Sequence, residues 1–307
     1  MTAGLVADLA ELIALQRIAQ AVKYAPEHRA LRAGHHLSKL RGRGMDFAEA
    51  RNYQAGDEIR HMEWRVTART GRPHIKLYQE ERERPVIILT DFSASMYFGT
   101  RGALKSVVAA RLASALAWTV IKEGDRVGGV IFSETNHHEF AARSRERGLL
   151  PFLASLSAYT QDNQAAFVTE QRAMAWNRAL SRLHRVIKPG SILVLISDFY
   201  QFDTESQQHL SRLRAHNDML AYHVCDAIEL APPKPARYAL SNGQQDVLLD
   251  TSQPSLFEAY QRHCSQKIAL LTQSLRRLQV QYVVVTAETD LAQLVRRSFP
   301  RRSHGAV

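Results

Sequence analysis

Oxygen-bearing side chains alternate in one short segment that directly follows an apolar run. Residues 91–95 read Asp-Phe-Ser-Ala-Ser, and residues 86–89 before them read Val-Ile-Ile-Leu. A tight loop with this spacing turns the aspartate and both serine oxygens toward one point. A second apolar run, residues 192–196, leads into a Ser-Asp pair and supplies another carboxylate. Oxygen ligands of this kind suit a hard cation such as Mg²⁺. The predicted metal ligands are Asp91, Ser93, Ser95 and Asp198.

A purely structural role is the alternative for the same residues. Asp91 could cap the helix that follows, and Ser93 and Ser95 could satisfy backbone donors. An isolated Asp-x-Ser-x-Ser pattern favours that simpler interpretation. The position directly after a buried strand, together with a second strand that ends in Ser-Asp, favours the metal site.

The elements that must position these side chains alternate between strands and helices. Short continuous apolar runs, as expected of strands buried on both faces, occur at residues 86–89, 127–132, 192–196, 219–224 and 282–285. Helical patterns occur at residues 103–122, 148–156, 172–187, 205–215, 255–278 and 291–297. This alternation predicts an α/β fold with a doubly wound, mostly parallel sheet. Ligands bind such sheets at the carboxyl ends of the strands, where the strand order reverses.

The N-terminal part differs from the rest in composition. Its first residues predict an amphipathic helix with one apolar face, made of Leu5, Leu9, Leu12 and Ala19. A basic, glycine-punctuated stretch follows, and residues 74–78 show strand alternation. Residues 59–66 suggest strand-like or mixed structure, with Trp64 packed in the interior. We therefore expect residues 28–80 to form a small β-containing basic subdomain.

These patterns divide the chain into three predicted segments. Residues 1–80 are expected to hold the N-terminal helix and the basic subdomain, and residues 81–300 the α/β domain. A hairpin excursion is expected around residues 232–252, because Asn-Gly at 242–243 favours a tight turn. Residues 301–307 form a basic tail.

Composition narrows the class of protein. The chain has 307 residues, 45% of them hydrophobic, so it can bury a sizeable core. A formal net charge of +10 favours acidic partners. Cys225 and Cys264 lack metal-ligand spacing, and neither a secretory signal nor a membrane-spanning run is visible. We expect a soluble cytoplasmic protein with reduced thiols.

Longer strings of residues resemble a known family. The chain is similar to the domain of unknown function 58 family, von Willebrand factor A-like proteins often encoded beside MoxR-type AAA+ ATPases. The similar strings are Arg-Gly-Arg-Gly-Met-Asp-Phe at 41–47, Tyr-Gln-Ala-Gly-Asp-Glu-Ile-Arg at 53–60, Trp-Arg-Val-Thr-Ala-Arg-Thr-Gly-Arg at 64–72, Glu-Glu-Arg-Glu-Arg-Pro at 80–85, and shorter ones at 98–101, 189–191, 197–199 and 226–230.

The resemblance implies a metal-ion-dependent adhesion site. Asp91, Ser93 and Ser95 would be its first-loop ligands and Asp198 its last-loop carboxylate. The ion would be Mg²⁺, or Mn²⁺ or Ca²⁺, and it would keep one position for an acidic side chain of a partner. Such sites also take a threonine from a middle loop. Thr160 and Thr169 are the nearest candidates, although neither lies in a Gly-Thr turn that opens a helix.

Arginines in the N-terminal subdomain allow two interpretations. Arg65, Arg69 and Arg72 could pair with Glu80, Glu81 and Glu83 and hold the subdomain to the core, since guanidinium groups suit bidentate pairs. Alternatively, the three arginines form a partner-binding face.

The sequence therefore predicts a non-catalytic, metal-dependent adaptor. Its expected partner is a MoxR-type AAA+ ATPase or a client of that ATPase, and no small-molecule substrate is expected. A Mg²⁺-dependent phosphohydrolase of the haloacid dehalogenase type is one alternative, but it needs a second aspartate where this chain has Ser93. The other alternative is a nucleic-acid-binding module that uses the basic stretch. Salt-dependent binding of DNA or RNA would identify it.

Overall fold

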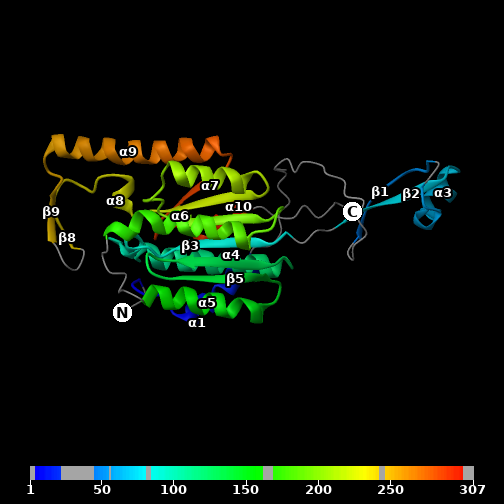
Figure 1. Cartoon of the computed structure of the whole chain (residues 1–307), viewed down its shortest axis with the longest axis horizontal. Coiled ribbons are helices and arrows are strands. Elements are labelled where there is room, and N and C mark those ends of the chain that lie inside the picture. The colour runs from blue at the N-terminus through cyan, green and yellow to red at the C-terminus, as the bar shows by residue number, and fades with distance from the viewer. Residues whose placement is uncertain are drawn as a thin grey trace. The chain divides into compact units, whose positions relative to one another are not determined.

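The computed structural model describes residues 4–21, 45–54, 57–80, 84–161, 169–241 and 246–299 (Figure 1). These residues belong to two compact units, and each is described by itself below. The larger unit contains residues 4–21 and 84–299, and the smaller one contains the described part of residues 45–80. The N-terminal helices therefore fold with the α/β core and not with the basic subdomain, with which the sequence grouped them as residues 1–80. The basic tail lies outside the described residues.

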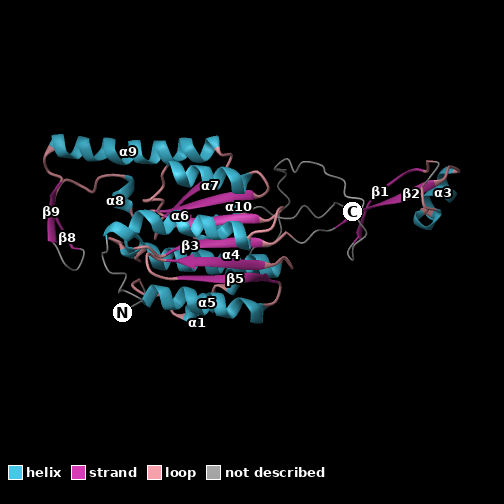
Figure 2. Ribbon diagram, viewed as in Figure 1, coloured by secondary structure: helices cyan, strands magenta, loops and turns pink. Residues whose placement is uncertain are grey.

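A six-stranded sheet forms the centre of the larger unit (Figure 2). The strand order is β10-β7-β6-β3-β4-β5, and every neighbouring pair is parallel except β4 and β5. The strands are β3 (Val86–Asp91), β4 (Val127–Phe132), β5 (His137–Arg143), β6 (Ile192–Ser197), β7 (Asp218–Val224) and β10 (Gln281–Val285). This confirms the predicted doubly wound, mostly parallel sheet. The order reverses between β3 and β6, which pair directly.

Alternating side chains of the central strands enter two separate cores. Val86 and Ile88 of β3 belong to one apolar cluster, and Ile87 and Leu89 belong to the other. Such a strand is apolar throughout because both faces of the sheet are covered. The edges differ. In β10, predicted as buried, only Val285 is buried, and β5 was not predicted because His, Glu and Arg occupy its exposed positions.

Helices cover both faces of the sheet. One layer contains α1 (Leu9–Ala14), α2 (Gln16–Ala21), α4 (Lys105–Lys122), α5 (Glu146–Gln161) and α10 (Leu291–Ser298). The other contains α6 (Thr169–Val186), α7 (Thr204–Arg214) and α9 (Pro254–Arg277). The predicted N-terminal helix is split into α1 and α2. Leu12 and Ala19 are buried as expected, whereas Leu5 and Leu9 are exposed. None of the described helices is long and apolar enough to cross a membrane.

Two further elements lie between β7 and α9. The short helix α8 (Ala227–Leu230) follows β7 directly. The predicted hairpin is confirmed as β8 (Arg237–Ser241) paired antiparallel with β9 (Asp246–Asp250). Its Asn-Gly turn at 242–243 lies outside the described residues.

The smaller unit pairs β1 (Met45–Asn52) antiparallel with β2 (His74–Glu80), and η1 (Ile59–His61) and α3 (Trp64–Thr70) lie between them in sequence. Of the strand-like or mixed structure expected for residues 59–66, the mixed form is confirmed: η1, a single bridge from Met62 to Ile75 and the start of α3 follow one another. Glu63 caps α3 through the backbone N–H of Arg65, and Gly71 ends the helix at a left-handed φ of 68°. Trp64 is 65% exposed and does not pack in the interior as expected.

Candidate metal centre

The ends of β3 and β6 bring the two predicted aspartates to the same edge of the sheet. Thr90 pairs with Ile196 in a parallel register, so Asp91 and Ser197 follow at equivalent positions. The Ser197 hydroxyl donates a hydrogen bond of 2.6 Å to Asp91 Oδ2. The switch point of the sheet is therefore tied together by side chains as well as by backbone hydrogen bonds.

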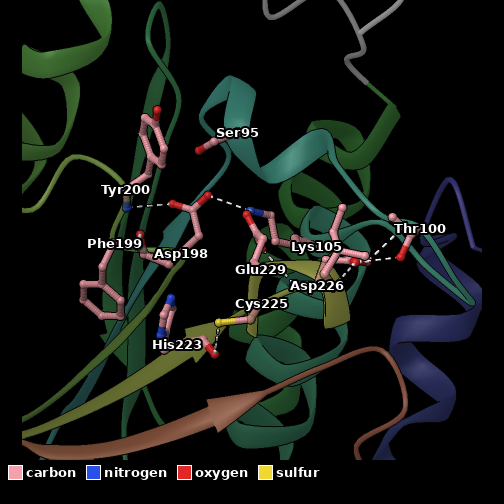
Figure 3. A network of polar contacts seen from close by, with 12 residues as sticks. Ser95, Thr100, Lys105, Asp198, Phe199, Tyr200, His223, Cys225, Asp226 and Glu229 are labelled. Atoms are coloured by element: carbon pink, nitrogen blue, oxygen red, sulfur yellow. Dashed lines mark hydrogen bonds and ion pairs between the residues drawn. The ribbon is translucent and has the colours of Figure 1, made fainter. Parts of the chain in front are cut away.

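The loop after β3 turns its serines back toward the aspartates. The backbone N–H of Ser93 donates to Asp91 Oδ1 at 2.8 Å, and the Ser93 and Ser95 hydroxyl oxygens are 3.4 Å apart. The Ser95 side chain lies beside the Asp198 carboxylate (Figure 3). All four predicted ligands thus converge, and all but the half-buried Ser95 are buried.

The two aspartates interact electrostatically. Burial and the neighbouring charge of Asp198 raise the pKa of Asp91 to about 7, although the hydrogen bonds from Ser197 and Ser93 oppose this shift. Two carboxylates in a desolvated site disfavour each other's charged form. A cation bound between them would relieve both the repulsion and the loss of hydration.

Lys105 is a residue of this centre that the sequence interpretation missed. It begins α4, is 2% exposed, and its ammonium donates to Asp198 Oδ2 at 2.9 Å and to Glu229 Oε1 at 2.7 Å. Burial alone would lower the pKa of Lys105, but Asp198 and Glu229 outweigh burial and raise it. Burial would likewise raise the pKa of Asp198, but Lys105 holds it below its usual value. Asp198 is therefore an ionised carboxylate with an internal counter-ion.

The hydrogen-bond network extends from Lys105 to α8 (Figure 3). The second carboxylate oxygen of Glu229 accepts the backbone N–H of Asp226 at 2.8 Å. The Asp226 carboxylate accepts from both the backbone N–H and the hydroxyl of Thr100, at 2.7 and 2.6 Å. The start of α4, the loop before it and α8 are thus connected to Asp198 by charged and polar contacts.

The turn after Asp198 has an unusual backbone conformation. Phe199 adopts a positive φ of 50°, which is uncommon outside glycine and costs roughly 1–2 kcal/mol. Its ring is buried and lies edge-on to Trp176, with ring centroids 5.4 Å apart. This packing holds the turn, and the backbone N–H of Tyr200 donates to Asp198 Oδ1 at 3.0 Å. Both oxygens of Asp198 are therefore oriented by fixed partners.

Glu134 is a further acidic residue at this edge that sequence reasoning did not identify. It follows β4, is 6% exposed, and its Oε1 accepts the backbone N–H of Ala94, between the two ligand serines, at 2.8 Å. Its Oε2 has no hydrogen-bond partner among the described residues. The Ser-Glu-Thr sequence at 133–135 resembles an ordinary surface turn, so only the fold reveals that Glu134 supports the ligand loop.

The other predicted site residues have different surroundings. The buried hydroxyl of Thr160 donates to the Ser157 carbonyl at 2.7 Å and accepts the backbone N–H of Ala7 at 3.1 Å, so it has a structural role at the end of α5. Thr169 is the first residue of α6, and its side chain is outside the described part of the chain. Arg65, Arg69 and Arg72 are exposed in the smaller unit; the side chains of Glu80, Glu81 and Glu83 are not described.

The donor set fits a hard divalent cation. Asp91, Ser93, Ser95 and Asp198 offer only carboxylate and hydroxyl oxygens, the ligands preferred by Mg²⁺. In the described residues no three His, Cys, Asp or Glu side chains are grouped to hold a metal ion. The two hydroxyls are therefore required members of the proposed ligand set.

A doubly wound sheet with an Asp-x-Ser-x-Ser loop at its switch point defines a von Willebrand factor A-like protein. The chain belongs to the family described as protein of unknown function DUF58, whose model matches residues 49–269. Uncharacterized proteins of Mycobacterium tuberculosis and Mycobacterium bovis are each 28% identical to it over 271 residues, which is 88% of this chain and 83% of theirs. The predicted family is thereby confirmed.

Solved structures of low sequence identity were also found. The conserved hypothetical protein BatB from Bacteroides thetaiotaomicron superimposes with a TM-score of 0.43 at 14% identity, over 70% of this chain and 96% of that chain. A von Willebrand factor type A protein from Catenulispora acidiphila gives a TM-score of 0.36 at 11% identity, over 72% of this chain and 42% of that chain. TM-scores this low do not indicate the function of this chain.

Proposed function

We propose that this chain is a non-catalytic protein-binding module that uses a divalent cation at the β3–β6 switch point. The cation is Mg²⁺, or Mn²⁺ or Ca²⁺, held by Asp91, Ser93, Ser95 and Asp198. The observation that carries the proposal is the convergence of these four oxygen donors at the carboxyl ends of two adjacent parallel strands. The bound ion supplies a positive charge for an acidic side chain of the partner.

The surrounding residues prepare the site for this task. Ser197 and the Ser93 backbone orient the two oxygens of Asp91, and the Tyr200 backbone orients Oδ1 of Asp198, whereas the Lys105 ammonium holds Oδ2 in the metal-free protein. Preorganised ligands lose little conformational entropy when they bind an ion. Ser95 is the least buried of the four, which supports access for a partner from its side.

The partner that we propose is a MoxR-type AAA+ ATPase, or a client protein on which that ATPase acts. The family resemblance of the sequence motivates this choice. The joint task would be assembly or maturation of a client complex. Purified ATPase and this chain should associate in the presence of Mg²⁺ and separate in EDTA.

The absence of catalysis is part of the proposal. A phosphohydrolase of the haloacid dehalogenase type needs a proton donor two residues after its nucleophilic aspartate, and Ser93 occupies that position. Incubation with p-nitrophenyl phosphate and Mg²⁺ tests this. Turnover that disappears in Asp91→Asn would contradict a purely binding function.

The partner interaction is tested with two matched variants. Asp198→Asn removes one ligand charge at the site, and Glu258→Gln removes one acidic charge from the exposed surface of α9. We expect Mg²⁺-dependent association with the ATPase to be lost only in Asp198→Asn. Association that survives both this substitution and EDTA would show that the metal centre is not the binding site.

A further inference from the structure

One buried ammonium group bridges two carboxylates at the edge of the metal centre. The Nζ of Lys105 donates to Asp198 Oδ2 at 2.9 Å and to Glu229 Oε1 at 2.7 Å. The side chains of Lys105 and Asp198 are 3% and 4% exposed, whereas that of Glu229 is 30% exposed. Only Asp198 belongs to the proposed ligand set, so the two carboxylates have different roles when a divalent cation binds.

Lys105 and a divalent cation compete for the Asp198 carboxylate. Both are positively charged, and like charges repel strongly at short range in a buried site. A cation that takes Asp198 as a ligand therefore weakens the Lys105–Asp198 bond. Because the Lys105 side chain is 3% exposed, an ammonium that lost Asp198 and had no other acceptor would be a buried, uncompensated charge. Release of Asp198 therefore requires a second acceptor inside the protein.

Glu229 has the geometry of this second acceptor (Figure 3). While its Oε1 accepts from Lys105, its Oε2 accepts the backbone N–H of Asp226 at 2.8 Å. Asp226 in turn accepts the backbone N–H of Ile228 at 3.1 Å and two hydrogen bonds from Thr100. None of these contacts that orient Glu229 involves Asp198. Glu229 can therefore stay in place when Asp198 changes its partner.

Contacts away from the two carboxylates also hold Lys105 and α8. The Tyr260 hydroxyl of α9 donates to the Ile228 carbonyl of α8 at 2.7 Å. The Nζ of Lys105 lies 5.9 Å from the centroid of the Phe98 ring, which adds a weak cation–π attraction. The position of α8, and with it that of Glu229, is thus fixed by α9 as well as by Lys105.

We propose that Glu229 is a positioning residue of the metal centre: it keeps the Lys105 ammonium when a divalent cation takes the Asp198 carboxylate, and it thereby sets the affinity of the centre for that cation. The inference rests on the proposed metal centre and concerns how that centre is regulated. Lys105 is the internal cation of the metal-free state, and Glu229 makes its release from Asp198 possible.

A simpler explanation would give Glu229 a direct effect on the cation through its negative charge. The two explanations differ in the part played by Lys105. If Glu229 acts by holding the ammonium, its charge matters for metal affinity only while Lys105 is present. If Glu229 attracts the cation directly, its charge matters more without Lys105, because no ammonium then neutralises it.

A double-mutant cycle, measured by calorimetric titration of Mg²⁺ into the EDTA-treated, dialysed full chain, separates these explanations. Glu229→Gln removes the charge of the second acceptor and keeps the size of the side chain. We expect this substitution to weaken Mg²⁺ binding about tenfold when Lys105 is present. In the Lys105→Met background it should change the Mg²⁺ affinity by less than about threefold.

Two further variants serve as controls. Glu229→Asp keeps the charge on a side chain one methylene shorter, so it should weaken Mg²⁺ binding less than Glu229→Gln does. Glu258→Gln removes an acidic charge from the exposed surface of α9 and should leave the Mg²⁺ affinity unchanged. Circular dichroism should show wild-type spectra for all variants; if Glu229→Gln did not fold, Glu229→Asp would take its place in the cycle.

The possible results distinguish this inference from the proposed function. Equal weakening by Glu229→Gln with and without Lys105, or no weakening in either background, would overturn the role of Glu229 and leave the metal centre in place. Absence of Mg²⁺ binding by the wild type would overturn the metal centre and this inference together.

Discussion

Replacing Lys105 by methionine removes a buried charge while it keeps an unbranched side chain of similar length. Two carboxylates then lose their counter-ion: Asp198, whose side chain is 4% exposed, and Glu229, whose side chain is 30% exposed. Removing one partner of a buried ion pair destabilises proteins by about 3–5 kcal/mol. Since water can reach Glu229, most of the loss comes from Asp198. We therefore expect the free energy of unfolding of metal-free Lys105→Met to fall by about 3 kcal/mol.

Metal binding makes this variant informative about function. A divalent cation at Asp198 replaces the missing positive charge, and the ammonium no longer competes for Oδ2. Lys105→Met should therefore bind Mg²⁺ more tightly than the wild type, and saturating Mg²⁺ should restore most of the lost stability. Adding Asp198→Asn should remove both the destabilisation and the rescue.

Urea unfolding with EDTA and with Mg²⁺ measures both effects. Lys188→Met is a control, because the Lys188 side chain is exposed; its loss should cost about 0.5 kcal/mol or less, with no response to Mg²⁺. If Mg²⁺ stabilised Lys105→Met no more than the wild type, the cation would not bind next to Asp198, and the reasoning would be refuted.

Three other substitutions probe the same structure. Asp91→Asn should stabilise the metal-free protein by roughly 3 kcal/mol at pH 8. Because the pKa of the folded Asp91 carboxyl is raised to about 7, this carboxyl lowers the stability of the fold progressively as the pH rises from about 4 to 7, and asparagine removes that loss. Urea unfolding in EDTA should show the gain shrinking at pH 5, and a loss of stability at pH 8 would contradict it. Glu134→Ala removes the acceptor of the Ala94 N–H and should weaken Mg²⁺ binding about tenfold in a calorimetric titration. Circular dichroism should show an intact fold. An unchanged Mg²⁺ affinity would mean that Glu134 does not support the ligand loop. Gly129→Ala places a methyl group 2.4 Å from the Phe152 ring, so it should lower the free energy of unfolding in urea by about 1–3 kcal/mol. An unchanged midpoint of the urea unfolding curve would show that the ring moves freely.

The central sheet could be predicted from local pattern because its strands are apolar on both faces. β3 and β6 each stand out as short continuous apolar runs, and the residues that follow them could be placed at one edge by topology alone. Strand β5 could not be predicted, since its exposed positions carry polar residues that resemble a loop. Trp64 was misassigned because hydrophobicity implies burial only on average.

The metal centre could be predicted from the sequence only where a ligand directly follows a predicted strand. Asp91 and Asp198 carry that signal. Lys105 could not be predicted in this way, because its partners Asp198 and Glu229 are 93 and 124 residues away in sequence. No residue near Lys105 in the sequence indicates these contacts. The lysine at the start of a largely apolar helix was the hint that the sequence offered. Thr160 has the right residue type, but backbone groups occupy its hydroxyl.

Calorimetric titration of Mg²⁺ into the EDTA-treated, dialysed full chain tests the central claim most directly. Wild-type protein should bind one ion, and the double variant Ser93→Ala and Ser95→Ala should bind none while it keeps the wild-type circular dichroism spectrum, because two hydroxyls at a strand end contribute little to packing. Equal Mg²⁺ binding by the wild type and the double variant would contradict a metal centre at Asp91, Ser93, Ser95 and Asp198.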